Sequence, residues 1–490
     1  MASEDPPQGR PAPPPSAGDP AVPPVDPSWR SLAEQSLSDP GQGRRHEQVR
    51  RFARPVERFI RLEVAGGVVI VIAVLQALIL ANSPWSESYR EFFDIHVAVD
   101  IWLWAFDESL KHWIDDALMV VFFFLVGLEI KREIVIGELS SPRKLAVPLV
   151  AAAGGMVVPV LVFFLFVDGG EASRGWAIPM ATDIAIALGV LTLLGSRVPA
   201  GLKVLLLGVA VVDDIGGVLV IAVFYTEALD YLALAIVAGV LATVVLFARY
   251  GVRPVYIYVA LGLVGWSAAE ASGIHPTIFG VVIGLMTPSR PLYAPAAFGA
   301  VAERLVTQFW RARAVRDGLE RREHEADALH SLSTIATETV APLDRLERSL
   351  LPWSAFLVVP LFAFANAGVD LRGGALEAAL GSSLALAVGL GLVVGKPLGI
   401  TLGAWLAVRF GATLPSGVSW TQLAAMGVIA GIGFTVALFI TELSYPAEVL
   451  GAGAAEELLR EAKVGILIGS VVAALAGLLT LAAVSRSGRA

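Results

Sequence analysis

Two adjacent aspartates, Asp213 and Asp214, stand in a run of the sequence that is otherwise apolar, "VAVVDDIGGVLV". A second charge in apolar surroundings is Lys396, in "LVVGKPLGI". A charged side chain near the centre of a bilayer costs about 2.5–3.5 kcal/mol on insertion scales. These residues therefore predict charges that are paired, or that bind an ion, inside a membrane.

The lysine and the aspartates are expected at similar depths. At 1.5 Å per helical residue, Asp213 lies roughly 15 Å from Lys203 and Lys396 roughly 20 Å from Arg409, both at inner helix ends. Neighbouring helical residues point about 100° apart, so one aspartate is expected to pair with Lys396 while the other faces an aqueous cavity. There it would exchange a proton for a hard cation, which carboxylate oxygen suits. An inert ion pair that fixes helix register leaves the second aspartate unexplained.

Thr182 and Asp183 lie beside a proline in "AIPMATDIA", where Pro179 is expected to break a helix. A carboxylate can balance the partial charges at a helix end. We expect Thr182 either to cap an exposed backbone group or to contribute an oxygen to the ion.

Further charges lie in "IDDALMVVFFFLVGLEIKREI", which carries Asp116 near one end and Glu129 and Glu133 near the other. The two glutamates are four residues apart and share a helix face. They would line an inner funnel that gathers cations, or would form a solvated helix end with Lys131 and Arg132 as partners.

Histidine and cysteine chemistry is restricted. Of six histidines only His275, in "SGIHPTIFG", falls within the apolar region, where a capping or turn role competes with proton sensing. No pair of histidines has metal-ligand spacing on a helix, and the absence of cysteine excludes thiolate sites. The glycine-rich "GLGLVVG" lacks the dinucleotide spacing, so it is read as a close-packing helix surface and not as a phosphate loop. We expect no cofactor and no nucleic-acid partner.

The elements that must position these residues are membrane helices. The chain has 490 residues, of which 56% are hydrophobic and 16% charged, and a spanning helix needs about 20 apolar residues. The predicted fold is an all-α polytopic membrane protein with twelve transmembrane helices. They fall at about 62–82, 113–136, 144–167, 175–196, 200–224, 231–249, 254–272, 276–289, 353–369, 381–408, 420–441 and 463–484.

Basic residues gather in alternate loops, which predicts that both termini are cytoplasmic. With this topology, spans 3–5 and 10–12 form two inverted repeats. The middle span of each repeat is interrupted, by Pro179 in the fourth and by Gly431 and Gly433 in the eleventh. Matching breaks in inverted repeats indicate the ion site of a transporter.

The remaining segments have simpler interpretations. Residues 1–58 read as a disordered, Pro-rich cytoplasmic tail, and "HVAVDIWLW", near 96–104, alternates as a strand or hairpin with an edge for a second subunit. The stretch at about 291–350 reads as a partly helical cytoplasmic insertion, solvated or regulatory.

The sequence resembles the NhaA-type sodium/proton antiporters over nearly all of residues 59–484. The resemblance rests on seven motifs in order: "DDALMVVFFFLVGLEIKRE", "GWAIPMATDIAIALGVLTLLGSRVP", "VAVVDDIGG", "SGIHPTIFGVVIG", "VPLFAFANAGV", "GKPLGI" and "GIGFTVALFI".

The resemblance implies crossed, broken fourth and eleventh helices and electrogenic exchange, by alternating access, of cytoplasmic Na⁺ or Li⁺ for external H⁺ in pH and sodium homeostasis. It implies a homodimer in the bacterial plasma membrane, the cell inner membrane. Asp214 would be at the cation site with Asp213 and Thr182, Lys396 would pair with Asp213, and Thr182 and Asp183 would be the broken-helix pair.

The resemblance also divides the chain and assigns further residues. Residues 59–490 would form the membrane domain, with an ion-translocating core at about 144–226 and 381–484 and interface helices at about 62–136 and 231–369. The positions that correspond to funnel charge and pH response are Asp116, Glu129, Glu133, His275 and Glu347. Arg348 and Leu351 follow Glu347 where family members have histidines, which departs from the family's pH-response pattern.

Three other function classes predict different observations. Sodium-coupled uptake of an organic anion uses a similar architecture but releases few protons. An intramembrane aspartyl protease needs facing aspartates from separate helices, whereas Asp213 and Asp214 are adjacent on one. A non-transporting scaffold leaves the central charges unexplained.

Overall fold

The computed structural model describes residues 65–101, 104–137, 140–226, 229–252, 255–313 and 318–487. The predicted disordered tail at 1–58 lies outside the described residues. Tyr293–Thr339 form one compact unit, and the rest of the described chain forms a second, larger unit.

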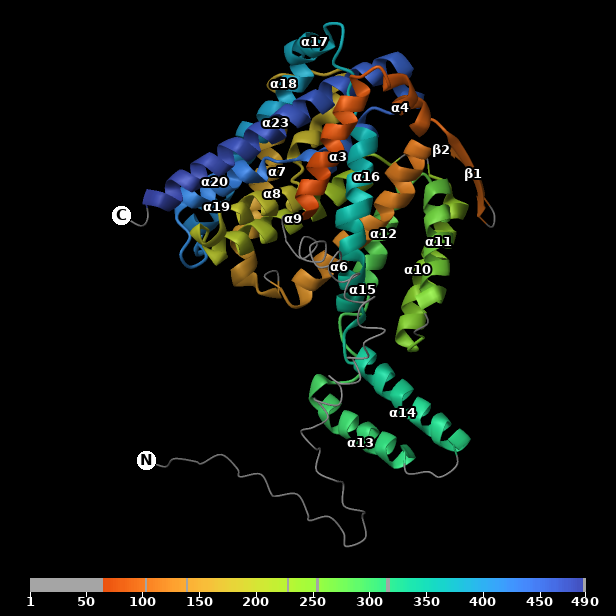
Figure 1. Ribbon diagram of the computed structural model, residues 1–490. Helices are drawn as coiled ribbons and strands as arrows, with labels where there is room; N and C mark the ends of the chain where they lie inside the picture. Colours follow the sequence, from red (N-terminus) through yellow and green to blue (C-terminus); the bar gives the residue numbers. More distant parts are fainter. Residues whose placement is uncertain are drawn as a thin grey trace, which may run out of the picture. The chain divides into compact units, whose positions relative to one another are not determined.

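The described chain is mostly helical (Figure 1). Its α-helices are α3 (Ala65–Ala81), α4 (Ser86–Phe93), α5 (Leu110–Trp113), α6 (Met119–Val135), α7 (Pro142–Phe163), α8 (Ile184–Leu193), α9 (Ala200–Phe224), α10 (Tyr231–Arg249), α11 (Val255–Ala271), α12 (Pro276–Met286), α13 (Pro295–Arg313), α14 (Gly318–Glu338), α15 (Pro342–Trp353), α16 (Val359–Asn366), α17 (Ala375–Gly381), α18 (Ser383–Leu390), α19 (Lys396–Arg409), α20 (Trp420–Ala430), α21 (Phe434–Ser444), α22 (Ala447–Leu450) and α23 (Ala452–Ser487). Glu171–Met180 and Gly195–Arg197 are 3₁₀ helices, and π-helical turns occur at Ile114–Leu118, Ser354–Val358 and Gly391–Gly395.

Six helical segments of the described chain are long and apolar enough to cross a membrane, or nine if each of three bent pairs counts as one span. The six are Leu145–Phe163, Ala200–Phe224, Tyr231–Arg249, Pro342–Asn366, Ser383–Arg409 and Ala452–Val484. The predicted spans at 113–136, 254–272 and 276–289 fall on shorter helices, α6, α11 and α12, of 17, 17 and 11 residues.

The two predicted helix breaks are confirmed. Glu171–Met180 meets α8 at 41°, and α20 meets the following helical segment at 46°. After Pro179 the chain becomes extended at Ala181 before α8 begins. A side chain on Gly433 would collide with the carbonyl of Ala181 and with Leu392, so glycine allows the second break to lie against the first.

Gly399 and Gly403 of α19 pack closely on α7. A Cβ added at Gly399 would collide with the backbone of Gly154, and one at Gly403 with the backbone of Val150. Small residues that let helix backbones approach in this way are typical of membrane helix pairs. This packing fixes α19, and with it Lys396, against its neighbour.

The predicted hairpin is also confirmed. Strands β1 (His96–Ile101) and β2 (Trp104–Ser109) pair antiparallel, with His96 opposite Ser109 and Ile101 opposite Trp104.

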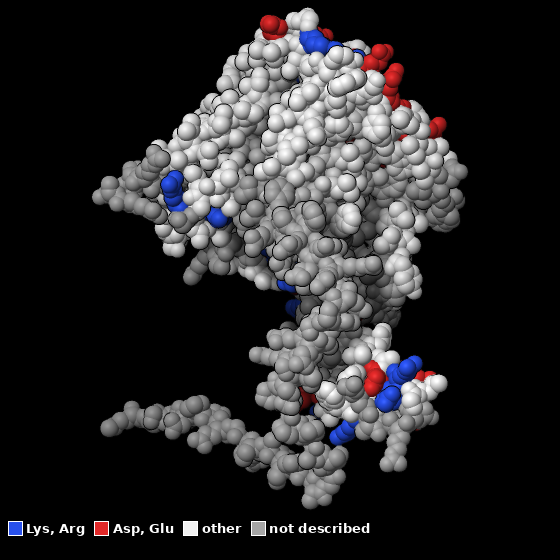
Figure 2. Space-filling model, viewed as in Figure 1, with Lys and Arg blue, Asp and Glu red and all other residues white. Residues whose placement is uncertain are grey.

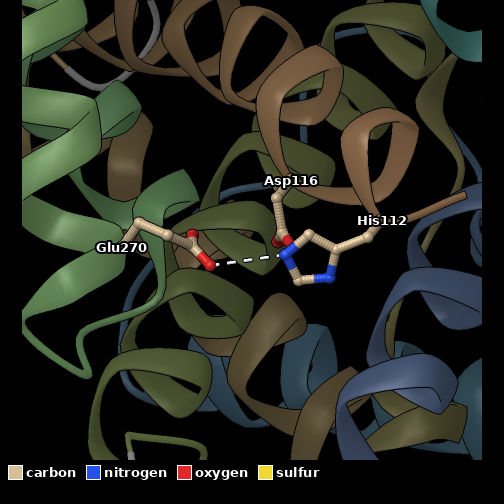
Figure 3. A group of neighbouring side chains, drawn as sticks. All are labelled: His112, Asp116 and Glu270. Carbon is tan, nitrogen blue, oxygen red and sulfur yellow. Dashed lines mark hydrogen bonds and ion pairs between the residues drawn. The ribbon is translucent and has the colours of Figure 1, made fainter. Parts of the chain in front are cut away.

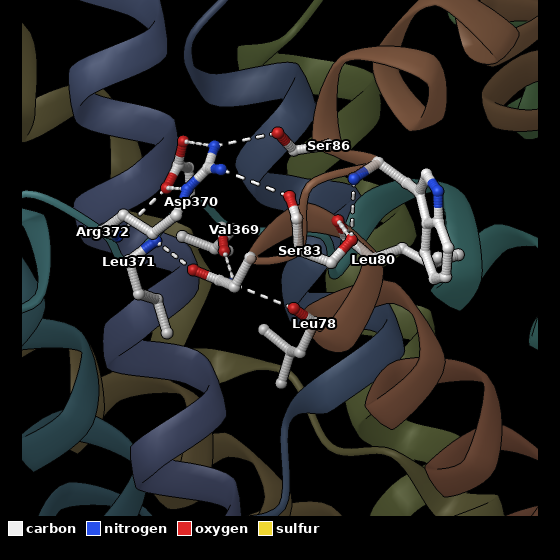
Figure 4. A network of polar contacts seen from close by, with 10 residues as sticks. Leu78, Leu80, Ser83, Ser86, Val369, Asp370, Leu371 and Arg372 are labelled. Atoms are coloured by element: carbon white, nitrogen blue, oxygen red, sulfur yellow. Dashed lines mark hydrogen bonds and ion pairs between the residues drawn. The ribbon is translucent and has the colours of Figure 1, made fainter.

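Asn82 and Arg372 join the end of α3 to the loop after α16. Arg372 bonds Ser83 O and Ser86 Oγ, and Asn82 accepts a bond from Leu371 N, in the network that Figure 4 shows.

Two helices differ from the predicted bounds. The span predicted at 353–369 continues a helix that begins at Pro342, where Leu343, Leu346 and Leu350 pack on α6. Helix α23 begins at Ala452, before the predicted residue 463. The prediction began later because the first turns of this helix are charged and do not have the hydropathy of a membrane span. In the smaller unit, α13 and α14 form a helical hairpin, as expected for a partly helical insertion.

The larger unit exposes apolar side chains along its helices. On α3, Val71, Ile72, Leu75 and Ile79 are each 45–65% exposed. Figure 2 shows a wide surface without acidic or basic groups, which lies between charged residues at its upper end and a few basic residues lower on the left. A face of this size and composition is expected where helices contact lipid.

Candidate ion-binding site

Lys396 and Asp213 form an ion pair in the centre of the larger unit. Lys396 Nζ lies 2.6 Å from Asp213 Oδ2, and both side chains are almost completely buried. Lys396 also donates to the carbonyl of Met180, at the end of the 3₁₀ segment. The lysine thus neutralises a carboxylate on α9 and the negative end of a broken helix at once.

Asp213 is only half satisfied by this pair. Its second oxygen, Oδ1, is buried and has no hydrogen-bond partner among the described residues. The neighbouring Asp214 is partly exposed, and no hydrogen bond or ion pair joins it to another residue that the structure describes. Carboxylate oxygens in this condition can accept a proton or a hard cation.

The two broken helices cross at Asp183. The Asp183 backbone N–H donates to Ile432 O at 2.6 Å, and Thr182 Oγ1 donates to Ala430 O at 3.0 Å. Asp183 Oδ1 accepts from Ile186 N, and its Oδ2 accepts from Thr435 N and Thr435 Oγ1. One carboxylate therefore caps the N-termini of α8 and α21, where it balances two positive helix ends.

Thr182 was expected either to cap a backbone group or to contribute an oxygen to the ion. The structure contains a hydrogen bond from its hydroxyl to the backbone carbonyl of Ala430. A small cavity opens beside it and is lined by Thr182, Asp213 and Asp214 together with apolar residues of α6, α9 and α21. The doublet and the crossing thus border one small cavity, and Lys396 is joined to it through its ion pair with Asp213.

The residues expected to carry funnel charge and pH response form two groups at opposite ends of α6. Asp116 Oδ1 lies 3.5 Å from His275 Nε2 at the start of the helix. Glu129 and Glu133 lie at its end, where Arg132 pairs with Glu347 of α15. Arg132 therefore has a partner on another helix, while its own side chain remains 47% exposed at this helix end.

The comparisons with known proteins decide the family. The family described as Na⁺/H⁺ antiporter 1 matches residues 57–481. The chain is 44% identical to Na(+)/H(+) antiporter NhaA of Rhodopirellula baltica over 88% of this chain and 94% of that protein. It is 40% identical to Na(+)/H(+) antiporter NhaA of Rhizobium meliloti over 90% of this chain and 98% of that protein. It is 43% identical to Na(+)/H(+) antiporter NhaA of Acidithiobacillus ferrooxidans over 88% of this chain and 98% of that protein.

The chain belongs to the NhaA Na⁺/H⁺ antiporter family. Membership supports sodium/proton exchange, with Na⁺ and H⁺ as substrates, and implies a transporter rather than an enzyme. Together with the apolar helices, it makes the antiporter a membrane-embedded, multi-pass protein.

Sequence reasoning missed several polar partners in this antiporter. Thr435, in the first turn after the second helix break, is a hydrogen-bond donor to Asp183 that the sequence did not single out. Asn366 donates to Asp115 Oδ1 at 2.5 Å. Glu442 pairs with Lys111 at 2.7 Å and with Lys463 at 2.6 Å.

Proposed function

We propose that this antiporter is an electrogenic secondary transporter that exchanges cytoplasmic Na⁺ or Li⁺ for external H⁺ by alternating access, in pH and sodium homeostasis. The observation that carries the proposal is the buried Lys396–Asp213 ion pair next to Asp214. Both aspartates line the cavity at the helix crossing. Three titratable groups at one small space supply more proton sites than a single cation displaces.

In the proposed cycle, the cation binds to Asp214, with oxygens from Asp213 and Thr182. Asp213 is released for this purpose when Lys396 loses its proton. If Asp214 also loses a proton, two protons leave for each monovalent cation bound, so that net charge crosses the membrane. The unpartnered Asp213 Oδ1 supports this assignment, since it has an oxygen free for the ion.

Asp183 and Thr182 are proposed to hold the broken-helix crossing. The role of Asp183 is to balance the ends of α8 and α21, so that the cation does not meet two uncompensated helix dipoles. Glu129, Glu133 and Glu347 would attract cations to the cytoplasmic entrance, and Asp116 and His275 would respond to pH at the opposite end.

The proposed architecture has twelve spans, two inverted repeats and cytoplasmic termini in the bacterial plasma membrane. Two breaks with similar angles support the repeats, and α6, α11 and α12 supply the spans beyond nine. The core would comprise about 144–226 and 381–484, and the interface helices about 62–136 and 231–369. The insertion near 291–350 and the tail at 1–58 would face the cytoplasm.

A homodimer through the hairpin near 96–104 is the proposed assembly. A two-stranded sheet leaves backbone groups on its outer edges available for a second copy of the chain. The lipid bilayer would surround the dimer.

Exchange in proteoliposomes tests the proposal. A sodium gradient is imposed while internal pH and membrane current are recorded; we expect proton movement opposite to sodium, with current. Asp214→Asn should abolish both signals and sodium binding while the protein still inserts into the membrane. The control variant Asp230→Asn, at the N-cap of α10, should retain exchange. The absence of sodium-driven pH change between about pH 6 and 9 would contradict the proposal, as would retained sodium affinity in Asp214→Asn.

A further inference from the structure

His112, Asp116 and Glu270 bring three metal-ligating side chains together away from the Asp213 cavity (Figure 3). His112 lies on α5 and Asp116 four residues later in the π-helical turn, so both point to one side of the helix. Glu270 reaches them from the end of α11. The three ligand atoms all lie within 4.8 Å of one another.

The spacing of these atoms suits one small metal ion. His112 Nε2 is 3.1 Å from Asp116 Oδ2 and 3.4 Å from Glu270 Oε1. Nitrogen and oxygen atoms that bind one tetrahedral Zn²⁺ at about 2.0–2.2 Å lie roughly 3.3–3.6 Å apart. The two distances to His112 are therefore close to those of a tetrahedral site, and the two carboxylate oxygens, within 4.8 Å of each other, would close on the ion. The fourth position is left for water.

The charges of the group also favour a cation. Asp116 is more than nine-tenths buried, and Glu270 Oε2 is buried with no hydrogen-bond partner among the described residues. Two carboxylates in such a place repel each other unless a positive charge lies between them. The unpartnered oxygen offers a further ligand that the present contacts do not use.

Aromatic side chains cover part of the group, and the His112 side chain is 40% exposed. Phe106, Trp113 and Trp266 line the same small cavity as the three ligands, and the rings of Trp113 and Trp266 lie 5.7 Å apart. Glu108 of β2 also lines the cavity and adds negative charge. Ionic interactions strengthen where aromatic rings replace water in this way.

His275 holds the buried carboxylate from behind. Its Nε2 lies 3.5 Å from Asp116 Oδ1, the oxygen that does not face His112, and its Nδ1 contacts Thr277 Oγ1 at 3.0 Å. A histidine behind a carboxylate ligand is the kind of outer partner that orients metal ligands.

We propose that His112, Asp116 and Glu270 bind one divalent transition-metal ion of the Zn²⁺ type. The imidazole nitrogen selects against Ca²⁺ and Mg²⁺, which prefer oxygen-only sites. The competing occupant is a proton on His112, which would then act as an imidazolium bridging the two carboxylates. The two occupants differ in a measurable way, because only the metal is retained as a stoichiometric ligand.

Zinc binding to the purified full-length protein in detergent tests the proposal. The protein is stripped with a chelator, dialysed against Zn²⁺ in the presence of excess Mg²⁺, and analysed for bound metal. We expect one Zn²⁺ per chain. Glu270→Gln, which keeps the shape of the side chain, and His112→Gln should each weaken binding by about tenfold or more, as losing a metal-site partner commonly does.

His330→Gln is the matched control, because His330 is exposed on α14 in the other unit and should leave zinc affinity unchanged. If His112→Gln does not fold, Glu270→Gln alone decides. Failure of the wild type to retain Zn²⁺, displacement of zinc by Mg²⁺, or unchanged affinity in folded Glu270→Gln would each overturn the site. Because the measurement uses no transport, its failure would leave the proposed exchange untouched.

Discussion

Thr435 donates its hydroxyl to Asp183 Oδ2 at 2.6 Å, and this bond joins the two broken helices. The residues are 252 positions apart, and both are buried at the crossing. The Thr435 backbone N–H also donates to the same oxygen, at 3.2 Å, so the hydroxyl adds a second bond at the N-terminus of α21. The bond thus ties the N-terminus of α21 to the N-cap of α8.

Replacing Thr435 with valine should destabilise the crossing. Valine keeps the shape of the side chain but removes the donor, and a hydrogen bond to a charged group contributes about 1.5–3 kcal/mol. We expect a lower melting temperature and slower sodium/proton exchange. Thr441→Val is the control, because Thr441 is equally buried but bonds only Ala437 O of its own helix. Equal effects of the two variants would show that the crossing bond has no special role.

Loss of Lys396 should destabilise the protein through the charge that remains. In Lys396→Ala, Asp213 is left buried without its partner, and breaking a buried pair from one side costs about 3–5 kcal/mol. The melting temperature should therefore fall much further than in Lys203→Ala, whose lysine is half-buried on α9.

A second substitution separates this cause from lost packing. Adding Asp213→Asn to Lys396→Ala removes the stranded charge, so the double variant should melt at a higher temperature than Lys396→Ala alone. A double variant that is no more stable would argue that packing of the lysine chain, and not its charge, was lost.

The parts of the fold that the sequence predicted are those with a strong local cause. A contact of Lys396 with one of the two aspartates followed from the cost of charges in lipid and from matching depths, and the family resemblance pointed to Asp213. The structure contains the contact with Asp213, and its role in ion binding stays a prediction. Pro179 and Gly433 marked the breaks because each weakens a helix directly. The strand or hairpin expected near 96–104 followed from residues that alternate with period two, and the observed hairpin extends to Ser109.

The remaining contacts depend on which helix faces meet, and periodicity does not carry that information. Glu270 reaches His112 from 158 positions away, so a search for histidine pairs on one helix could not find the group. Helix α15 was missed because its charged residues lower the hydropathy, while its leucines pack on α6. Hydropathy measures contact with lipid and does not measure contact with another helix.

The ion pair in the loop after α16 gives a pH-dependent contribution of known sign. Arg372 donates to Asp370 and lowers the pKa of that carboxyl to about 2, below its usual value of about 3.9. The folded state therefore binds the proton less tightly than the unfolded state. The stabilisation is fully present above about pH 4 and is lost as the pH falls through about 2.

Asp370→Asn should lower the melting temperature slightly at neutral pH, and the difference from wild type should shrink toward pH 2. The effect is small because both side chains are more than 40% exposed. Glu448→Gln, an exposed acid on α22, should show no such difference. A difference that grows on acidification would reverse the assigned sign.

Glu442 joins helices that belong to different parts of the proposed transport cycle. It pairs with Lys111 of α5, among the proposed interface helices, and with Lys463 of α23, in the proposed core. If the core moves against the interface helices, the Lys111 contact must break. Glu442→Gln should therefore favour the state in which that contact is absent, and should lower stability by about 1–3 kcal/mol because the lysines lose their counter-charge.

Cysteine labelling measures this shift, since the chain has no cysteine of its own. A single Val218→Cys substitution places a thiol at the cavity of the Asp213 site. Its reaction with a membrane-impermeant reagent, added on the side of the hairpin, should be faster in the Glu442→Gln background. Lys111→Gln should act in the same direction, because it removes the same contact from the other helix. Unchanged labelling in both backgrounds would show that the contact is static and does not control access to the site.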